Sequence, residues 1–258
     1  MNPLVSVIMP AYNAKKYIHE AIESVINQTY QNWELIVVDD CSTDGTKKII
    51  ETFACQDERI KPIYIDKNGG KPSIAKNFAL RHVVGKYIAF LDSDDIWILN
   101  KLALQVKIME ENIQYGLCYT GGYWIDEFGN EIKKFSPRYS NGYLLKNMLQ
   151  RYEINNQSVM ITTKALNDTI GLFNESITIG EDYNLFMHTV AKYEVVSIKK
   201  YLIKYRIHNN AITKSKKRVS DGVLVTLKEL NLFRKYPMYA LVTYLKAIRF
   251  KYIEKSWK

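Results

Sequence analysis

Residues 4–91 alternate between short apolar runs and segments in which apolar residues recur at helical spacing. The apolar runs predict strands over 4–9, 33–38, 60–65 and 86–91, with Pro10 expected to end the first. The segments between them predict helices over about 14–27 and 72–83, and another that carries Ile49, Ile50 and Phe53. A strand–helix alternation of this kind is typical of an α/β protein with a parallel sheet and right-handed crossovers.

The alternation weakens after Leu99, where predicted strands become more frequent. The spacing predicts a helix over 99–112, strands within 117–134, at 158–162 and around 195–205, and a helix over 183–191. Two further helices are predicted over 219–235 and 238–256. Because we find no internal repeat and no long linker, we expect one α/β domain over residues 1–213 and a helical appendage over 214–258.

The charge of the chain is concentrated at one end. Residues 1–213 hold 24 basic and 24 acidic side chains, whereas residues 214–258 hold 12 basic and 3 acidic ones, so the net charge of +9 lies in the last 45 residues. A domain that binds nucleic acid is usually basic over its binding surface. The neutral larger part therefore argues against a nucleic-acid partner, and the basic end points to an anionic surface.

Two clusters of aspartates follow predicted strands. Asp39 and Asp40 come directly after the second strand, and Asp92, Asp94 and Asp95 come after the fourth. Because ligands bind beyond the carboxyl ends of parallel strands, we expect both clusters to meet at that edge of the sheet. A single aspartate there would be ordinary turn chemistry, but five carboxylates repel one another and favour a cation. Mg²⁺ or Mn²⁺ suits them, since such ions combine carboxylates with water and substrate phosphates.

The sequence lacks the other common phosphate-binding motifs. Gly69-Gly70-Lys71 precedes Pro72, where a P-loop needs Ser or Thr, and no GxGxxG motif follows the first strand. Motifs typical of serine hydrolases, zinc peptidases and kinases are also absent. Phosphate binding is therefore expected to depend on the metal, on helix N-termini and on cations such as Lys71 and Lys76.

Several motifs then occur in an order typical of one enzyme family. They are "VSVIMPAYNAKKYI", "ELIVVDDCSTDGT", "NGGKPSIAKNFAL", "GKYIAFLDSDDIW", the pair Glu181-Asp182 and "YRIHNN". With them the chain resembles the family-2 glycosyltransferases of the GT-A fold, specifically the small bacterial enzymes that build surface polysaccharides and lipopolysaccharide. The resemblance covers about residues 4–213. It implies a Rossmann-like, mostly parallel sheet flanked by helices, a UDP-sugar donor, Mn²⁺ or Mg²⁺ as cofactor, and a glycan acceptor that is lipid-linked.

The resemblance also implies roles for individual residues at the nucleotide. Pro10, Ala11 and Tyr12 would line the nucleotide pocket, Asp39 would hydrogen-bond the base, and Asp40 would lie close to the nucleotide. Lys76 and Asn77 would lie near the nucleotide or its diphosphate, with Lys76 at a position where many relatives have Arg.

Further roles implied by the resemblance concern the metal and the sugars. Asp92-Ser93-Asp94 would form the DxD motif, with Asp92 near the ribose and Asp94 on the metal. His208 would be a further metal ligand. Asp95 and Trp97 would face the donor sugar or the acceptor.

The resemblance further implies that Asp182 is the general base. Inversion by direct attack of an acceptor hydroxyl needs a carboxylate to take the proton and a cation at the departing phosphate, but no protein nucleophile. Glu181 beside it would orient the acceptor or tune Asp182. The alternative for this pair is ordinary capping of a helix N-terminus.

Two other functions are compatible with parts of the pattern. A nucleotidyltransferase that makes a sugar nucleotide also uses carboxylates on an α/β sheet, but it should have a Gly-rich basic loop where this chain has Ala11-Tyr12-Asn13-Ala14. A subunit that binds a nucleotide sugar or a membrane without turnover would not need Asp92, Asp94 and Asp182 together.

The basic end and the cysteines bear on location. Apolar residues from Met238 to Tyr252 recur at three- and four-residue steps, with basic and aromatic residues between them. This pattern suits either a helix on an anionic membrane surface or a helix packed on the domain. Three widely spaced cysteines, and no charged leader with a long apolar run, favour a reducing compartment. We therefore expect a cytoplasmic protein, peripheral on the inner face of the cell membrane.

Overall fold

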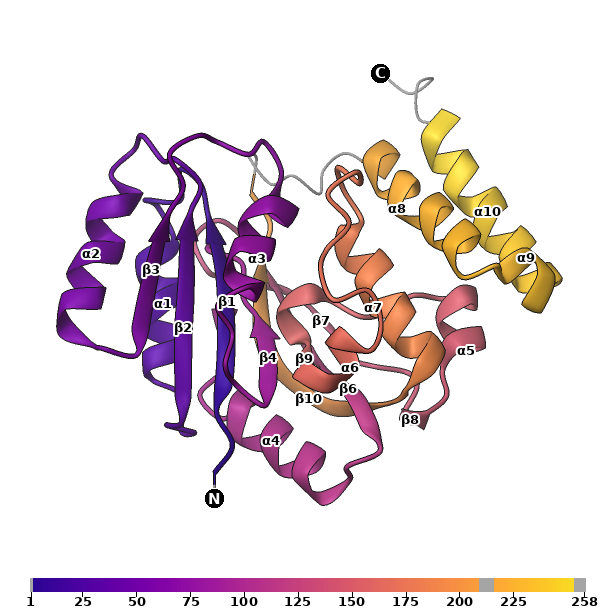
Figure 1. The fold of residues 1–258 in the computed structure, drawn as a ribbon, viewed down its shortest axis with the longest axis horizontal. Coiled ribbons are helices and arrows are strands. Elements are labelled where there is room, and N and C mark those ends of the chain that lie inside the picture. The colour runs from indigo at the N-terminus through magenta and orange to yellow at the C-terminus, as the bar shows by residue number, and fades with distance from the viewer. Residues whose placement is uncertain (1, 209–215, 253–258) are drawn as a thin grey trace.

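The computed structural model describes residues 2–208 and 216–252 (Figure 1). Within these residues ten strands form one sheet in the order β3-β2-β1-β4-β9-β6-β10-β5, with β7 paired to β6 and β8 paired to β10. The strands are β1 (Val5–Ala11), β2 (Trp33–Asp39), β3 (Ile60–Tyr64), β4 (Tyr87–Phe90), β5 (Ile96–Trp97), β6 (Tyr115–Ile125), β7 (Glu131–Phe135), β8 (Asn141–Gly142), β9 (Met160–Thr162) and β10 (Glu194–Arg206).

Helices cover both faces of this sheet. One hydrophobic core joins the sheet to α1 (Ile18–Ile26), α2 (Thr46–Gln56) and α4 (Lys101–Glu111). The other core joins it to α3 (Pro72–Leu80), α5 (Leu145–Gln150), α6 (Thr163–Asn167) and α7 (Glu181–Lys192). A short 3-10 helix, η1 (Asn156–Ser158), precedes β9. The two cores confirm the predicted α/β architecture.

The strands β3, β2, β1 and β4 are parallel, as the alternation of strands and helices predicted. The prediction that Pro10 ends the first strand is wrong, because β1 continues to Ala11. The carbonyl of Ile8 accepts from Leu91 on the β4 side, and Pro10, two residues on, faces the same way. The strand β4 ends at Phe90, so the missing N–H of Pro10 deprives no neighbour of a hydrogen bond.

The second half of the sheet is mixed. The strand β9 runs antiparallel to both β4 and β6, and the long strand β10 runs parallel to β6. As a result β10 ends near the turn that follows β4, which brings residues 206–208 to the edge that holds the aspartates. The three cysteines are free.

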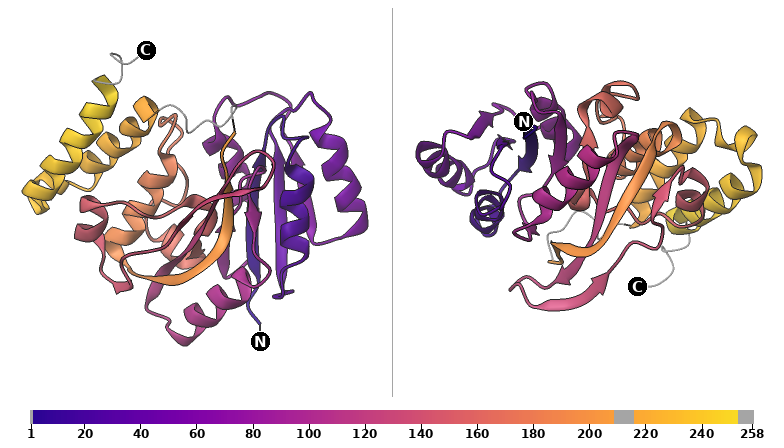
Figure 2. Two further views of the ribbon diagram at one scale, coloured as in Figure 1. Left: turned by 180° about the vertical axis from the view of Figure 1, so that it is seen from behind. Right: turned by 90° about the horizontal axis from the view of Figure 1, so that it is seen from below.

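The helices at the C-terminal end pack on the domain. They are α8 (Lys216–Glu229), α9 (Leu232–Lys235) and α10 (Pro237–Tyr252), and they lie beside α5 and α7, far from α2 (Figures 1 and 2). Leu227, Leu232 and Ala240 are part of the core that contains α7. The carbonyl of Gly180 would lie 2.3 Å from a Cβ atom at position 222, so only glycine permits this approach of α8 to the start of α7.

The predicted helix over 219–235 is interrupted. The helix α8 ends at Glu229, and α9 begins at Leu232 after Asn231, which has a positive φ of 52°. In the described ranges, 2–208 and 216–252, no helix combines the length and the apolar character needed to cross a bilayer.

Candidate active site

The two aspartate clusters meet at one edge of the sheet, as predicted. Ala11 at the end of β1 is aligned with Asp39 at the end of β2. The N–H of Asp40 donates to the carbonyl of Ala11 at 2.8 Å, and that of Leu91 donates to the carbonyl of Ile8 at 3.0 Å. The strands β2 and β4 therefore end on either side of β1. The polar residues that follow these two strands lie around the end of β1.

The predicted nucleotide pocket lies at the ends of β1 and β2. Ala11 is buried, Pro10 is half-buried, and Tyr12 is 54% exposed. Asp39 is buried, and no residue in the described part of the chain hydrogen-bonds its Oδ1 atom. Because an unpartnered buried oxygen is costly, this atom is suited to accept a hydrogen bond from a ligand.

Asp40 orders a neighbouring loop. Its Oδ1 atom accepts from the N–H of Gly69 at 2.8 Å, and its carbonyl accepts from the side-chain amide of Asn68 at 3.0 Å. These bonds hold the loop that leads from β3 into α3 against the end of β2.

A tight turn after β4, the DxD turn, carries Asp92-Ser93-Asp94, the predicted DxD motif. The N–H of Asp95 donates to the carbonyl of Asp92 at 3.1 Å. The carboxylate of Asp92 accepts from the side-chain amides of Asn156, at 3.3 Å, and of Gln157, both in η1. Desolvation raises the pKa of Asp92 to about 6, with a smaller lowering effect from Lys76. No sequence pattern singles out Asn156 or Gln157, since they stand in a short polar run between Ile154 and Val159.

Asp94 and His208 come together across 114 residues of chain. The Oδ2 atom of Asp94 lies 2.8 Å from Nε2 of His208, and their side chains are 31% and 11% exposed. The ring of His208 packs on that of Tyr17, with centroids 5.1 Å apart. Ser93, before Asp94 in the turn, is half-buried.

This pair fits a divalent cation. Two neighbouring ligands of an octahedral ion with bonds of about 2.1 Å lie about 3.0 Å apart, close to the spacing of these two atoms. One carboxylate and one imidazole suit Mn²⁺ or Mg²⁺ when substrate phosphates and water complete the shell. Across residues 2–208 and 216–252, no group of three or more His, Cys, Asp and Glu is arranged to hold a metal ion.

Asp95 and Trp97 are both buried, and their contact with the donor sugar or the acceptor stays a prediction. Asp95 is 1% exposed and accepts from the backbone N–H of Arg206 at 2.6 Å, which ties the turn to β10. Trp97 is 3% exposed, and its indole N–H donates to the carbonyl of Gln157. The ammonium of Lys101 lies 3.9 Å from its ring centroid. Both residues thus attach the chain after β4 to β10, Asp95 through its hydrogen bond with Arg206 and Trp97 through the pairing of β5 with β10.

The start of α7 places two carboxylates and one lysine at the site. Glu181 Oε1 lies 3.0 Å from Nζ of Lys76, and both side chains are buried. Burial lowers the pKa of Lys76, but Glu181, Asp92 and Asp182 together raise it by more, so the ammonium stays charged. Burial and then Glu181 raise the pKa of Asp182, and Lys76 opposes them. The Lys76 ammonium, on α3, is therefore stabilised by carboxylates from two other segments, the start of α7 and the turn after β4.

Asn77 holds a neighbouring loop, and its place near the nucleotide or the diphosphate stays a prediction. It is 1% exposed, and its amide group donates to the carbonyl of Phe173 at 2.9 Å and to Glu175 at 2.8 Å. Its oxygen accepts from the N–H of Phe173 at 2.8 Å. Its side chain thus holds the loop before α7, and the adjacent Lys76 faces the carboxylates.

The comparisons with known proteins agree with this geometry. The family described as "Glycosyl transferase family 2" matches residues 6–174. TuaG of Bacillus subtilis, named as a teichuronic acid biosynthesis glycosyltransferase, is 34% identical over 234 residues, which are 88% of each chain. WfgD of Escherichia coli, named as a UDP-Glc:alpha-D-GlcNAc-diphosphoundecaprenol beta-1,3-glucosyltransferase, is 36% identical over 83% of this chain and 81% of that protein.

Solved structures share the fold. Residues 1–349 of S. aureus TarS in complex with UDP-GlcNAc align with a TM-score of 0.74 and 22% identity, over 87% of this chain and 66% of that one. The mannosyltransferase PcManGT of Pyrobaculum calidifontis, in complex with GDP-Man and Mn²⁺, aligns with a TM-score of 0.66 and 19% identity, over 96% and 74%. With the α/β sheet and the match over most of its length, the chain belongs to glycosyl transferase family 2 and is a glycosyltransferase with the GT-A fold.

Proposed function

We propose that this enzyme transfers one sugar, with inversion, from a UDP-sugar to a hydroxyl group of a lipid-linked bacterial polysaccharide or lipopolysaccharide precursor, with Mn²⁺ or Mg²⁺ as cofactor. The observation that carries the proposal is the gathering of Asp92, Glu181 and Asp182 around Lys76 at one edge of the sheet, with Asp94 next to Asp92. UDP is favoured because TarS is seen with UDP-GlcNAc and WfgD is named for UDP-Glc. A lipid-linked acceptor is favoured because WfgD is named for a diphosphoundecaprenol substrate.

In this proposal the residues at β1 and β2 hold the nucleoside. The unpartnered Oδ1 of Asp39 accepts a hydrogen bond from the base, and Asp92, fixed by Asn156 and Gln157, faces the ribose. Asp94 and His208 would hold the divalent ion, which supplies positive charge to the departing diphosphate. Lys76 adds a second, fixed positive charge close by.

In this proposal the residues at the start of α7 act on the acceptor. Asp182 takes the proton from the attacking hydroxyl group, so it must be ionised. Burial raises the pKa of Asp182 and so disfavours its ionised form. The positive charge of Lys76, which pairs with Glu181, opposes this effect and favours ionisation. Glu181 is held by Lys76, and we assign it the tuning of Asp182 rather than contact with a sugar.

A screen of nucleotide sugars tests this function. We expect UDP release from one or more of UDP-glucose, UDP-galactose and their N-acetyl forms with Mn²⁺, and loss of at least about 100-fold in rate with EDTA. GDP-mannose serves as the matched negative donor. Release of diphosphate from UTP and a sugar 1-phosphate would instead indicate the nucleotidyltransferase. No turnover of any UDP-sugar with a diphosphate-lipid acceptor would contradict the proposal.

We also propose that α10 rests on an anionic membrane, where a lipid-linked acceptor would lie. The helix packs on the domain through Ala240, Thr243 and Ala247. Its opposite face exposes an apolar stripe, Met238, Leu241, Val242 and Leu245, which are 44–70% exposed. The basic residues Arg234, Lys235, Lys246 and Arg249 lie nearby and are exposed. Apolar side chains flanked by basic ones suit the surface of an anionic bilayer.

The double substitution Leu241→Ser, Leu245→Ser is expected to weaken binding to vesicles that contain phosphatidylglycerol by at least about tenfold. Both side chains are exposed, so folding should be unaffected. The control is Val84→Ser, Ile113→Ser, which removes two apolar side chains that are 75% and 88% exposed elsewhere. Co-sedimentation measures the effect. Equal binding of the two double variants would exclude the stripe as a membrane contact.

A further inference from the structure

Arg206, the last residue of β10, is a buried cation at the back of the DxD turn. Its side chain is 2% exposed. Its guanidinium group donates to the carbonyls of Asp94 at 2.8 Å, Asp126 at 3.4 Å and Glu127 at 3.2 Å, and pairs with the carboxylate of Glu20 at 2.5 Å. One planar group thus joins α1, the turn after β4 and the turn between β6 and β7.

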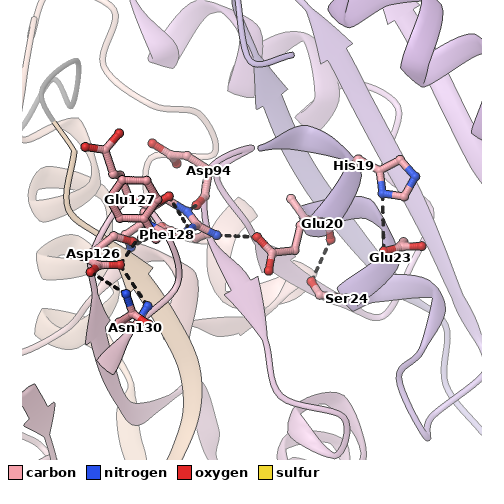
Figure 3. A network of polar contacts seen from close by, with 12 residues as sticks. His19, Glu20, Glu23, Ser24, Asp94, Asp126, Glu127, Phe128 and Asn130 are labelled. Carbon is pink, nitrogen blue, oxygen red and sulfur yellow. Dashed lines mark hydrogen bonds and ion pairs between the residues drawn. The ribbon is translucent and has the colours of Figure 1, made fainter. Parts of the chain in front are cut away.

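Figure 3 shows these segments around the same place. Glu20 reaches from α1 toward Asp94 and the Asp126–Asn130 turn, whereas Glu23, on the same helix, faces His19 instead. The Asp126–Asn130 turn is itself rigid, because the carboxylate of Asp126 accepts from the backbone N–H groups of Phe128 and Asn130 at 2.9 Å. The carbonyls of Asp126 and Glu127, which Arg206 binds, are therefore held in place by this turn.

The DxD turn is held at three points, and two of them involve Arg206. Asp92 is held by η1, the carbonyl of Asp94 is held by the Arg206 side chain, and the carboxylate of Asp95 is held by the Arg206 backbone. The side chain of Asp94 takes no part in these three contacts and lies against His208.

Arg206 also acts on the other member of that pair. Its guanidinium carbon lies 4.7 Å from the ring centroid of Tyr17, and the same ring packs on His208. His208 follows two residues after Arg206. The path of the chain into His208 and the contact of its ring with Tyr17 therefore both depend on the position of Arg206.

We propose that Arg206, with Glu20, is a positioning residue that sets the spacing of Asp94 and His208 and so the affinity of the site for a divalent cation. The inference rests on the proposed function, because it takes these two residues as the metal ligands. Groups that orient metal ligands from behind commonly change metal affinity by about 10- to 100-fold when they are removed. A lysine cannot replace the arginine, since it lacks the planar set of donors that reaches three segments at once.

The test is the affinity for Mn²⁺ in the presence of UDP, measured by electron paramagnetic resonance on the full chain, without turnover. We expect Arg206→Lys to weaken Mn²⁺ binding by about 10- to 100-fold and Glu20→Gln by about three- to tenfold. The matched control is Glu23→Gln, on the same helix, where a carboxylate of similar exposure pairs with His19 at 3.4 Å. Glu23→Gln should leave Mn²⁺ affinity unchanged, and thermal unfolding of all variants is followed in parallel.

The comparison of Glu20→Gln with Glu23→Gln tests the inference even if Arg206→Lys does not fold. Weaker Mn²⁺ binding in Glu20→Gln alone supports the inference. Equal Mn²⁺ affinity in both variants, or a lowered melting temperature in Arg206→Lys with unchanged Mn²⁺ affinity, would reduce Arg206 to a stabilising residue and leave the proposed function intact. A wild-type protein that binds UDP but no Mn²⁺ would overturn the metal part of the proposed function and this inference with it.

Discussion

Substitution of Asp182 by asparagine is expected to lower kcat for sugar transfer by a factor on the order of 100 or more, with the affinity for UDP unchanged. Asparagine keeps the size of the side chain but cannot accept the proton of the acceptor hydroxyl. Asp182 is half-buried at the first turn of α7, and its Oδ1 atom accepts from the N–H of Tyr183 at 2.7 Å, a bond that the amide oxygen of asparagine can retain. Initial rates and calorimetric titration with UDP separate the two effects.

The control for this variant is Asp57→Asn, the same substitution at the end of α2, near the amino ends of the strands. It should leave kcat within about twofold of wild type, because Asp57 pairs with Arg59 at 2.7 Å at the other end of the sheet, so its substitution affects stability rather than the site. Near-normal turnover of Asp182→Asn would remove Asp182 from the mechanism. Loss of UDP binding would instead make it a binding residue.

The pH dependence of kcat gives a second check on the same residue. Burial and Glu181 raise the pKa of Asp182 above its ordinary value of 3.8. The base works only when ionised, so kcat should rise with pH through a midpoint above that value. The rising limb should be absent from the residual activity of Asp182→Asn.

Substitution of Asp94 by asparagine is expected to have the second large effect, a loss on the order of 100-fold in Mn²⁺-dependent transfer. A metal that stabilises the leaving diphosphate contributes several kcal/mol, and each factor of ten in rate corresponds to about 1.4 kcal/mol. The carboxylate of Asp94 is partly exposed and lies against His208, so its loss removes a ligand without emptying the core. UDP affinity with and without Mn²⁺, measured by calorimetry, reports the metal directly.

The neighbouring carboxylate of Glu127 provides the control for Asp94. It is 40% exposed and pairs with Lys16 at 2.6 Å, so Glu127→Gln changes charge near the site without touching the proposed metal ligands. Glu127→Gln should respond to Mn²⁺ as wild type does. A full Mn²⁺ response in Asp94→Asn would show that the cation is held elsewhere.

The basic end of the chain shows what a helical pattern leaves open. The spacing from Met238 predicted an amphipathic helix, and the structure has a helix there, α10. The pattern did not say which side packs on the domain. The structure places the small side chains of Ala240, Thr243 and Ala247 inside, because α10 lies close against α5 and α8, and the larger apolar residues remain outside.

The order of strands and helices over residues 4–91 was sufficient to predict the parallel sheet, and with it the meeting of Asp39 with Asp92 and Asp94. The period of apolar residues and the turn chemistry are local properties, and carboxyl ends of parallel strands share an edge. Only the folded chain could decide that Asp95, Trp97 and Asn77 are buried supports, or that Arg206 reaches Glu20 across 186 residues. The meeting of Arg206 with Glu20 depends on the parallel pairing of β10 with β6, which brings the end of β10 to the aspartates. The spacing of residues along the chain carries no information about that pairing.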